Sequence, residues 1–302
     1  MREKYLKIRD KYFENFECRN YKFGIETIKI GSCKEFIKII EKFVEYKKYY
    51  IWRGQEKDWK LISKFDRDYI KKKFGYGKRD DTLNKIREKF IEHLKGLNPQ
   101  PHKIDFSKEV NIWSIGQHYG LSTPLIDWTE NPYIALYFAF CKKSKKEKCD
   151  KVVYAMNIGL KLDLRIFKIK VNKVPISRER KRLVDLIDLS DDKILKKDRR
   201  IKAQEAMFTE ALDGKKIEKY VKNFSKNRPK DIIKEKKIML IKILINDNDK
   251  SNYDFLNYLK NKKKITRGKL FPDYAGAVEV CNIDLKNLSS SGKDIFIKEL
   301  SI

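Results

Sequence analysis

Hydrophobic positions repeat with helical spacing in three segments of the chain. Apolar side chains recur every three or four residues after Ser32, again over residues 82–95, and again after Pro132. This spacing places them on one face of an α-helix, the face that packs against a core. Ser32 and Glu35 have the spacing of a capping box, and Asn131 precedes Pro132 in the order preferred at a helix start. The pattern therefore predicts three amphipathic helices.

Four other segments have the composition of β-strands. Residues 49–55, 152–158, 162–169 and 237–245 are rich in β-branched and aromatic side chains, and such side chains favour extended backbone. Residues 178–189, by contrast, are typical of a helix. Strands are therefore expected mainly in the second half of the chain, with one early strand that ends in Trp-Arg-Gly-Gln.

The chain is expected to form one domain. It contains no internal repeat and no long linker rich in Gly, Ser or Pro. We predict an α+β fold over residues 1–302, with an N-terminal helical portion at 1–48 and a core at 49–302 that contains a sheet and peripheral helices. Within that core, residues 59–81 are expected to form a basic loop.

The net charge of the chain bears on which partners it could bind. The chain has 71 Lys and Arg against 43 Asp and Glu, a formal net charge of +28. A surplus of this size attracts polyanions such as DNA and RNA. Two explanations of this charge stay open. It could serve a nucleic-acid partner, or it could reflect a general amino-acid bias, because the sequence is rich in Lys and Ile, poor in Pro, and has Lys almost everywhere.

The remaining totals indicate a soluble cytoplasmic protein. The chain is 41% hydrophobic, which is enough for a core, and its first residues are too charged for a signal peptide. No apolar run approaches the length of a membrane span. The five Cys include no C-x-x-C pair, so neither a disulfide framework nor a zinc site is indicated, and no metal is expected.

One segment concentrates polar and aromatic side chains. Residues 113–140 are interpreted as two helix-like stretches around a turn that contains a proline. The side chains that this turn presents are Gln117, His118, Tyr119, Thr123, Asp127, Trp128 and Thr129. Each has an ordinary structural explanation, such as a core tryptophan or an Asx turn. Because loops braced by rigid elements are frequent sites of function, the clustering makes this turn the first candidate for a site.

The rest of the sequence narrows the chemistry. It lacks G-x-G-x-x-G, G-x-x-x-x-G-K-[ST], H-E-x-x-H and G-x-S-x-G, which disfavours the common phosphate-loop, metalloprotease and hydrolase sites. Arg53 could instead bind phosphate, and Tyr119 or Trp128 could stack on a heteroaromatic ring. Polar contacts to a ribose or a leaving amide are expected from His118, Asp127, Gln204 and Glu205. A carboxylate beside a ribose would also stabilise an oxocarbenium-like transition state.

Four blocks of the sequence together resemble the FRG domain family. They are Trp52-Arg53-Gly54-Gln55, residues 117–139, residues 200–208 and residues 270–276. The blocks follow the order of the family. The second block, QHYGLSTPLIDWTENPYIALYFA, matches over its whole length and makes the resemblance specific.

This resemblance implies a fold and a ligand. FRG domains are similar to the ADP-ribosyltransferase superfamily, which implies a split β-sheet core with NAD bound in a cleft as a substrate. The residues implied to contact NAD are Arg53, Gly54, Gln55, His118, Tyr119, Thr123, Asp127 and Trp128. Those implied to act in catalysis are Arg53, His118, Asp127, Gln204 and Glu205. The catalytic carboxylate stays open among Asp127, Glu205 and Glu210.

Three hypotheses about function follow. The first is an NAD-dependent ADP-ribosyltransferase that modifies DNA or RNA, since the chain is basic and several bacterial relatives of the family serve in toxin–antitoxin or phage-defence systems. The second is a related enzyme that hydrolyses NAD or modifies protein. The third is a non-catalytic module that binds nucleic acid or nucleotide. An antitoxin or another defence-system protein is a further expected partner, and a membrane is not.

Overall fold

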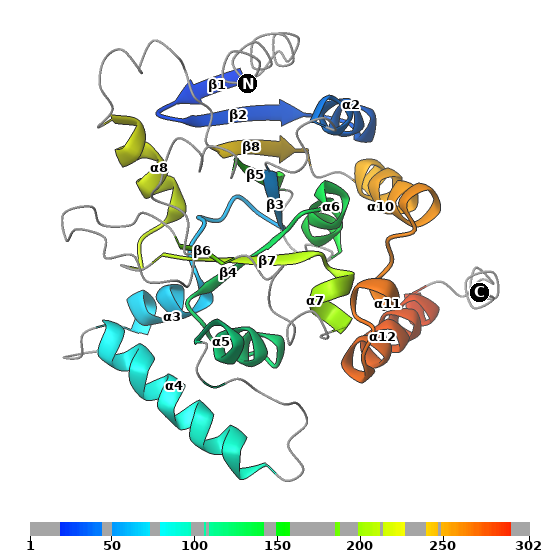
Figure 1. Cartoon of the computed structure of the whole chain (residues 1–302). Helices are drawn as coiled ribbons and strands as arrows, with labels where there is room; N and C mark the ends of the chain where they lie inside the picture. The colour runs from blue at the N-terminus through cyan, green and yellow to red at the C-terminus, as the bar shows by residue number, and fades with distance from the viewer. Residues whose placement is uncertain are drawn as a thin grey trace.

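The protein is an α+β structure built on one sheet (Figure 1). The computed structural model describes residues 19–43, 50–72, 79–97, 106, 109–141, 149–157, 185–187, 199–211, 214–226, 240–246 and 249–290. Eight strands in these ranges join the sheet, and helices lie on both of its faces. The fold class predicted from the sequence is therefore confirmed.

The strands and helices have the following bounds. The strands are β1 (Arg19–Lys22), β2 (Ile25–Ile30), β3 (Tyr50–Gln55), β4 (Leu125–Thr129), β5 (Lys151–Asn157), β6 (Asp185–Ile187), β7 (Ala206–Glu210) and β8 (Leu240–Ile245). The helices are α2 (Cys33–Phe43), α3 (Lys64–Lys72), α4 (Arg79–Gly96), α5 (Glu109–His118), α6 (Pro132–Phe140), α7 (Arg199–Ala203), α8 (Ile217–Lys226), α10 (Asp249–Lys263), α11 (Arg267–Leu270) and α12 (Tyr274–Ser290). Among the described helices, none combines the length and the apolar character needed to cross a lipid bilayer.

Two neighbouring strands of the sheet, β3 and β4, pair over a very short length. Its strand order is β1-β2-β8-β5-β3-β4-β7-β6, and neighbours are antiparallel except for the parallel pair β2–β8. β3 pairs with β5 along its whole length, and β4 does so with β7. In contrast, β3 and β4 pair only at Trp52 and Thr129. The two halves of the sheet therefore separate beyond that pair, and the opening positions the candidate site.

Hydrophobic cores lie on opposite faces of the sheet. Side chains alternate between the two faces of a strand, and β5 shows this directly. Val153 and Ala155 belong to the core under α2, α6 and α10, whereas Val152 and Tyr154 belong to the core under α8. A smaller core joins α3, α4 and α5 to β4 and β7.

Helix α6 supports β3 at unusually close range. The Asn131 side chain caps the helix by accepting a hydrogen bond from the N–H of Tyr133, and Pro132 occupies the first turn. A Cβ added to Gly54 would lie 1.7 Å from the main-chain oxygen of Ala135. Packing against α6 therefore requires glycine at position 54, whatever ligand the protein binds.

Elements with strong local signals are present, with shifted ends. The strands predicted at 49–55, 152–158 and 237–245 correspond to β3, β5 and β8, and the three predicted helices correspond to α2, α4 and α6. At the start of α2, the Ser32 hydroxyl accepts from the N–H of Glu35 and donates to its carboxylate. Local periodicity was sufficient for these elements.

Other expectations are wrong or lie outside the described residues. Residues 19–30 form two paired strands that extend the sheet, so the N-terminal portion is not only helical. α3 replaces part of the expected basic loop, because Phe65 and Tyr69 stack along one helical face in the core with α4 and α5. Residues 185–187 form β6 rather than a helix, through pairing with β7. The strand predicted at 162–169 lies outside the described residues.

Candidate ligand-binding site

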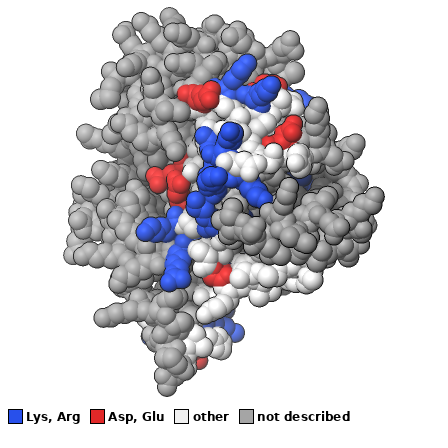
Figure 2. Space-filling model, turned by 90° about the vertical axis from the view of Figure 1, so that its right-hand side faces the viewer, with Lys and Arg blue, Asp and Glu red and all other residues white. Residues whose placement is uncertain are grey.

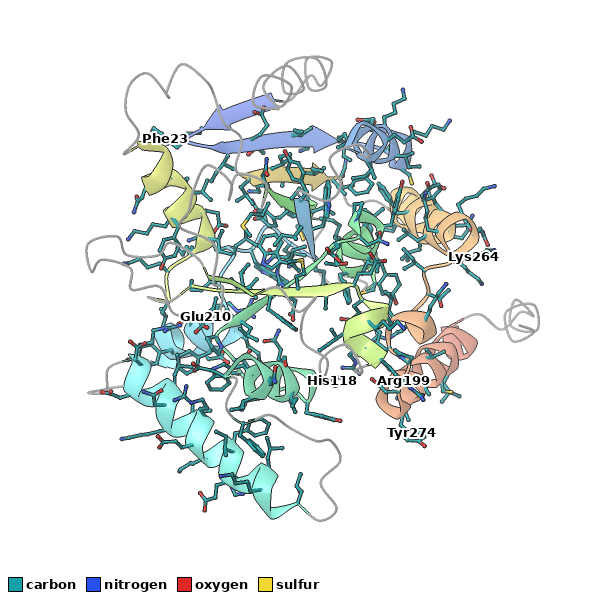
Figure 3. The ribbon with its side chains drawn as sticks, in the orientation of Figure 1. Phe23, His118, Arg199, Glu210, Lys264 and Tyr274 are labelled. Carbon is teal, nitrogen blue, oxygen red and sulfur yellow. The ribbon has the colours of Figure 1, made fainter. Side chains whose placement is uncertain are left out.

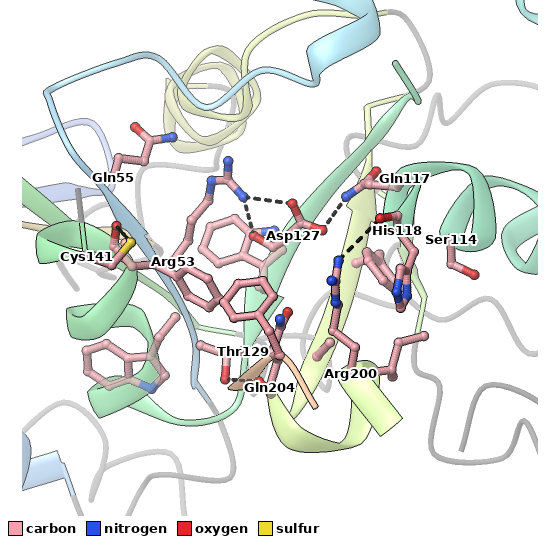
Figure 4. Close-up of a pocket in the computed structure, with 18 of the residues that line it drawn as sticks. Arg53, Gln55, Ser114, Gln117, His118, Asp127, Thr129, Cys141, Arg200 and Gln204 are labelled. Atoms are coloured by element: carbon pink, nitrogen blue, oxygen red, sulfur yellow. Dashed lines mark hydrogen bonds and ion pairs between the residues drawn. The ribbon is translucent and has the colours of Figure 1, made fainter. Parts of the chain in front are cut away.

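A cavity lies in the opening between β3 and β4 (Figure 4). Its volume is about 410 Å³, within the range of small-molecule sites. We call it the β3–β4 cavity. Its walls come from both halves of the sheet and from helices α3, α5, α6 and α7. The charged and polar residues on its walls include Arg53, Arg67, His118, Asp127, Arg200 and Gln204.

Arg53 spans the gap between the two strands. Its Nη1 donates a hydrogen bond of 2.7 Å to the main-chain oxygen of Asp127 and lies 3.7 Å from the Asp127 carboxylate. In the amide orientation that satisfies both of its neighbours, Gln55 accepts from Arg53 Nε at 3.2 Å. Burial lowers the pKa of Arg53 from its usual value, Asp127 opposes this effect, and the charge of Arg67 adds to it. The guanidinium stays charged, because an arginine pKa begins far above neutrality.

Asp127 lies in a strand, whereas the sequence suggests a turn. β4 pairs with β7 from end to end, so alternation directs Trp128 into the core and leaves Asp127 on the cavity side. The Asp127 carboxylate accepts a hydrogen bond from Gln117 Nε2, and Gln117 in turn accepts from the Thr123 hydroxyl. The Asp127 side chain is 59% exposed. It is therefore an oriented but accessible carboxylate.

Arg200 organises the opposite side of the cavity. Its guanidinium donates to both oxygens of the Asp273 carboxylate, at 2.9 and 3.1 Å, and to the main-chain oxygen of His118 at 3.3 Å. His118 Nε2 lies 3.5 Å from the same carboxylate. Burial raises the pKa of Asp273, but the N–H of Gly276 and the charge of Arg200 outweigh burial, so the pKa lies below its usual value. Arg200 thus positions His118 rather than presenting a free charge.

Gln204 and Glu205 are adjacent but have different surroundings. Gln204 lines the cavity; its Nε2 donates to the Leu270 carbonyl at 3.1 Å, and its main-chain oxygen accepts from Thr129 Oγ1 at 2.7 Å. Glu205 has a φ of 46°, and its carboxylate accepts from Asn131 Nδ2 at 2.8 Å. Glu205 therefore braces the start of α6 instead of lining the cavity.

Most of the residues implicated by the sequence meet at this one cavity. Those that line it are Arg53, Gly54, Gln55, His118, Asp127, Trp128 and Gln204. Trp128 contributes little surface, since it is 2% exposed and its indole N–H donates to the Thr209 hydroxyl at 2.8 Å. The structure thus unites positions that are far apart in the sequence, although Trp128 has mainly a core role.

Four implicated residues do not line the cavity. Tyr119 is 71% exposed and stacks on His118. Thr123 is buried, and its hydroxyl donates to Gln117, which in turn donates to Asp127. Glu205 is turned toward Asn131, and Glu210 lies at the other end of β7, well apart from His118 in Figure 3. Of the three candidate carboxylates, Asp127 is the one on the cavity wall.

Sequence reasoning missed several cavity residues. Glu56, Trp59, Arg67 and Phe271 all line the cavity. Trp59 and Arg67 lie in the segment expected to be a basic loop, and no local motif marks them. Arg67 reaches the cavity on α3, and Trp59 precedes that helix. Phe271 belongs to the block at residues 270–276 that resembles the FRG family, so the sequence carries a signal for it.

The ionic groups of the cavity suit an anion better than a cation. Three guanidiniums lie on its wall, those of Arg53, Arg67 and Arg200, against the two carboxylates of Glu56 and Asp127. In the described part of the chain, no group of three or more His, Cys, Asp or Glu side chains could hold a metal ion. A phosphorylated ligand is the class that two guanidiniums recognise best.

The segment that forms one wall of this cavity matches a known protein family. Residues 48–148 match the model of the FRG domain family. This segment, about a third of the chain, is similar to FRG domains. The family resemblance seen in the sequence is thus confirmed over the segment that holds Arg53, His118 and Asp127. A search of curated proteins and a search of solved structures each gave no significant match.

The FRG match accounts for only part of the cavity. It includes β3, α3 to α6 and β4. Other wall residues lie outside the match: Arg200 is in α7, Gln204 directly follows α7, and Phe271 directly follows α11. The FRG domain therefore supplies the wall with Arg53 and Asp127, and the later part of the chain completes the enclosure.

Proposed function

We propose that this FRG-domain chain is an NAD-dependent ADP-ribosyltransferase. The observation that carries the proposal is the pairing of Arg53 and Asp127 across the opening of the sheet, on the wall of the β3–β4 cavity. A fixed guanidinium suits the phosphates of NAD. An accessible carboxylate beside it suits the positive charge that develops on a ribose during cleavage. The family match and the separated halves of the sheet support the same assignment.

The proposed reaction breaks the bond between ribose C1′ and the nicotinamide nitrogen. The electron pair of that bond leaves with nicotinamide, whose ring becomes neutral. The Asp127 carboxylate stabilises the oxocarbenium ion that remains. His118 and Gln204, on the Arg200 side of the cavity, bind the hydroxyls of that ribose or the amide of nicotinamide. An acceptor nitrogen or oxygen then attacks C1′ and releases its proton to solvent.

Nucleic acid is the proposed acceptor. Lys260, Lys262, Lys264 and Lys269 are exposed on and between α10 and α11. Figure 2 shows Lys and Arg side chains running down the face of the molecule on which these helices lie. This basic segment leads directly to Phe271 on the cavity wall. A polyanion bound along the segment would lie next to the cavity, and an enzyme of this kind would serve as a toxin or an antiviral effector.

Labelled NAD provides the test. The chain is incubated with NAD carrying label in its adenylate phosphate, together with DNA, RNA or cell protein. We expect label in nucleic acid and one released nicotinamide for each transfer. Nicotinamide release with no labelled macromolecule would identify an NAD glycohydrolase instead, and label in protein would change the acceptor class.

A negative result is equally informative. Absence of both release and transfer in the folded wild-type chain would contradict the enzyme proposal and favour a non-catalytic binding module. The Arg53→Lys, Asp127→Asn double variant serves as the activity control, provided that its Tm shows it to be folded.

A further inference from the structure

Trp59 differs from the other three tryptophans of the chain. Trp52, Trp113 and Trp128 are at most 2% exposed, whereas Trp59 is 45% exposed and lines the β3–β4 cavity. None of the other described aromatic rings stacks on it. An indole face left open beside a cavity is suited to stacking on a planar ligand ring.

The main chain at Trp59 is held in place. Its carbonyl accepts from the Tyr154 hydroxyl at 3.1 Å and, in the amide orientation that satisfies both of its neighbours, from Gln55 at 2.8 Å. The Tyr154 hydroxyl is also 3.2 Å from Asp58, which forms an ion pair with Lys242. The backbone that carries the indole is therefore ordered before a ligand arrives, which reduces the entropy lost on binding.

Arg67 is the second unusual residue of the cavity. Its guanidinium has no hydrogen-bond or ion-pair partner among the described residues. It shares the cavity with Arg53 and lies near enough for its charge to add to the effect of burial in lowering the pKa of Arg53. Two guanidiniums on the wall of the same cavity repel each other, and an anion that binds to both offsets this repulsion.

Helix α3 keeps Arg67 at the cavity. Asp66 accepts two hydrogen bonds from Arg79, at 2.6 and 3.2 Å. Asp68 accepts from the Ser122 hydroxyl at 2.8 Å. The residues on either side of Arg67 are thus tied to α4 and to the segment before β4, so Arg67 cannot swing away with its helix.

We propose that Trp59, Arg53 and Arg67 form a subsite for a nucleoside diphosphate. Trp59 stacks on the base, and the two guanidiniums bind the diphosphate. The inference rests on the proposed function for the identity of the whole ligand. The ADP half of NAD would occupy this subsite, and the nicotinamide ribose would lie toward Asp127 and His118. Trp59 thereby takes the stacking role that the sequence suggests for Tyr119 or Trp128, because the first lies off the cavity wall and the second is buried.

Titration with ADP tests the subsite without any turnover. Trp59 is the exposed tryptophan on the cavity wall, so we expect ADP to change its emission and the Trp59→Phe variant to lose that change. Arg67→Gln is expected to weaken the binding of ADP and of inorganic pyrophosphate by about tenfold or more, the loss of a charge-assisted contact. Lys89→Gln removes the same charge from an exposed position on α4 and should leave both affinities unchanged.

Adenosine separates the two halves of the subsite. Its binding should weaken in Trp59→Leu and stay unchanged in Arg67→Gln, because adenosine has no phosphate. Failure of the wild-type chain to bind ADP would overturn the subsite. Wild-type ADP affinity in both Trp59→Leu and Arg67→Gln, each with unchanged Tm, would overturn it as well.

The test distinguishes this subsite from the proposed enzymatic function. ADP binding that depends on Trp59 and Arg67, in a chain that neither releases nicotinamide nor transfers ADP-ribose, would support the subsite and contradict the enzyme. NAD turnover whose KM is unchanged in both variants would support the enzyme and overturn the subsite.

Discussion

Arg53 donates a 2.7 Å hydrogen bond to the main-chain oxygen of Asp127, on the neighbouring strand. The contact lies just beyond Trp52 and Thr129, the residues at which the backbones of β3 and β4 stop pairing. One side chain thus reconnects the two halves of the sheet and places positive charge at the cavity wall. The same contact joins the two strands at the cavity where the reaction is proposed.

The fork of the Arg53 guanidinium should be essential, beyond its charge. Arg53→Lys keeps the charge but cannot contact both Asp127 and a phosphate. We expect ADP and NAD affinity to fall about tenfold or more, the loss of a hydrogen bond to a charged group. Calorimetric titration measures this loss. Arg199→Lys, at an exposed position on α7, is the matched control, and equal affinity in the two variants would contradict the role of Arg53.

Asp127 should be the carboxylate that acts on the ribose. Asp127→Asn removes the negative charge with little change in shape, so nicotinamide release should fall by about a hundredfold or more. ADP affinity should change much less. Glu205→Gln and Glu210→Gln are the comparison variants, and both should retain turnover. Greater loss of nicotinamide release in Glu205→Gln than in Asp127→Asn would show the assignment to be wrong.

Gly54→Ala should destabilise the fold. The added methyl group would overlap the main chain of α6 at Ala135, and overpacking of this kind costs about 1–3 kcal/mol. Gly268→Ala provides the control, because nothing lies within 4 Å of its added Cβ. Thermal unfolding measures the difference. We expect a clear fall in Tm for the first variant and little change for the second; equal Tm values would refute this account of the glycine.

The Arg200–Asp273 pair should make stability depend on pH in acid. The pKa of Asp273 is lowered in the folded state, so its ionised form stabilises the fold above the unfolded-state pKa of about 4. That contribution is lost as the pH falls through the lower folded-state value. Asp273→Asn should therefore reduce the free energy of unfolding at pH 7, and the difference from wild type should shrink toward pH 3.

Urea unfolding at several pH values checks this dependence. Asp81→Asn, which removes an exposed carboxylate from α4, controls for the change in net charge. A difference between wild type and Asp273→Asn that grows on acidification would have the wrong sign and would contradict the ion-pair account.

The elements predicted correctly are those whose signals are local. Asn131 and Pro132 mark the start of α6 through capping geometry and a fixed φ, both of which act within one turn. The aromatic and β-branched run before Gly54 indicates β3 for the same reason. In contrast, the polar residues and the proline between the two helix-like stretches predict a turn at β4, and only pairing with β7 makes the segment a strand.

For the candidate site, too, the sequence indicates some residues correctly and cannot distinguish others. The sequence singled out Arg53, His118, Asp127 and Gln204, all of which line the cavity. It could not separate Gln204 from Glu205, because a backbone turn with φ of 46° at Glu205 decides which side chain reaches the cavity. It also could not separate Trp59 from the other tryptophans, since exposure is a property of the packed fold.

By itself the sequence indicated the resemblance to FRG domains, the α+β class and the residue types of the proposed phosphate-binding site. These depend on short-range periodicity and on motif residues that stay recognisable without their surroundings. Only the tertiary structure decided that the sheet opens between β3 and β4, that Asp127 faces the opening, and that Arg67 joins Arg53 there. Such relationships depend on strand pairing and helix packing between distant segments, and no local pattern records which distant segment will supply the partner.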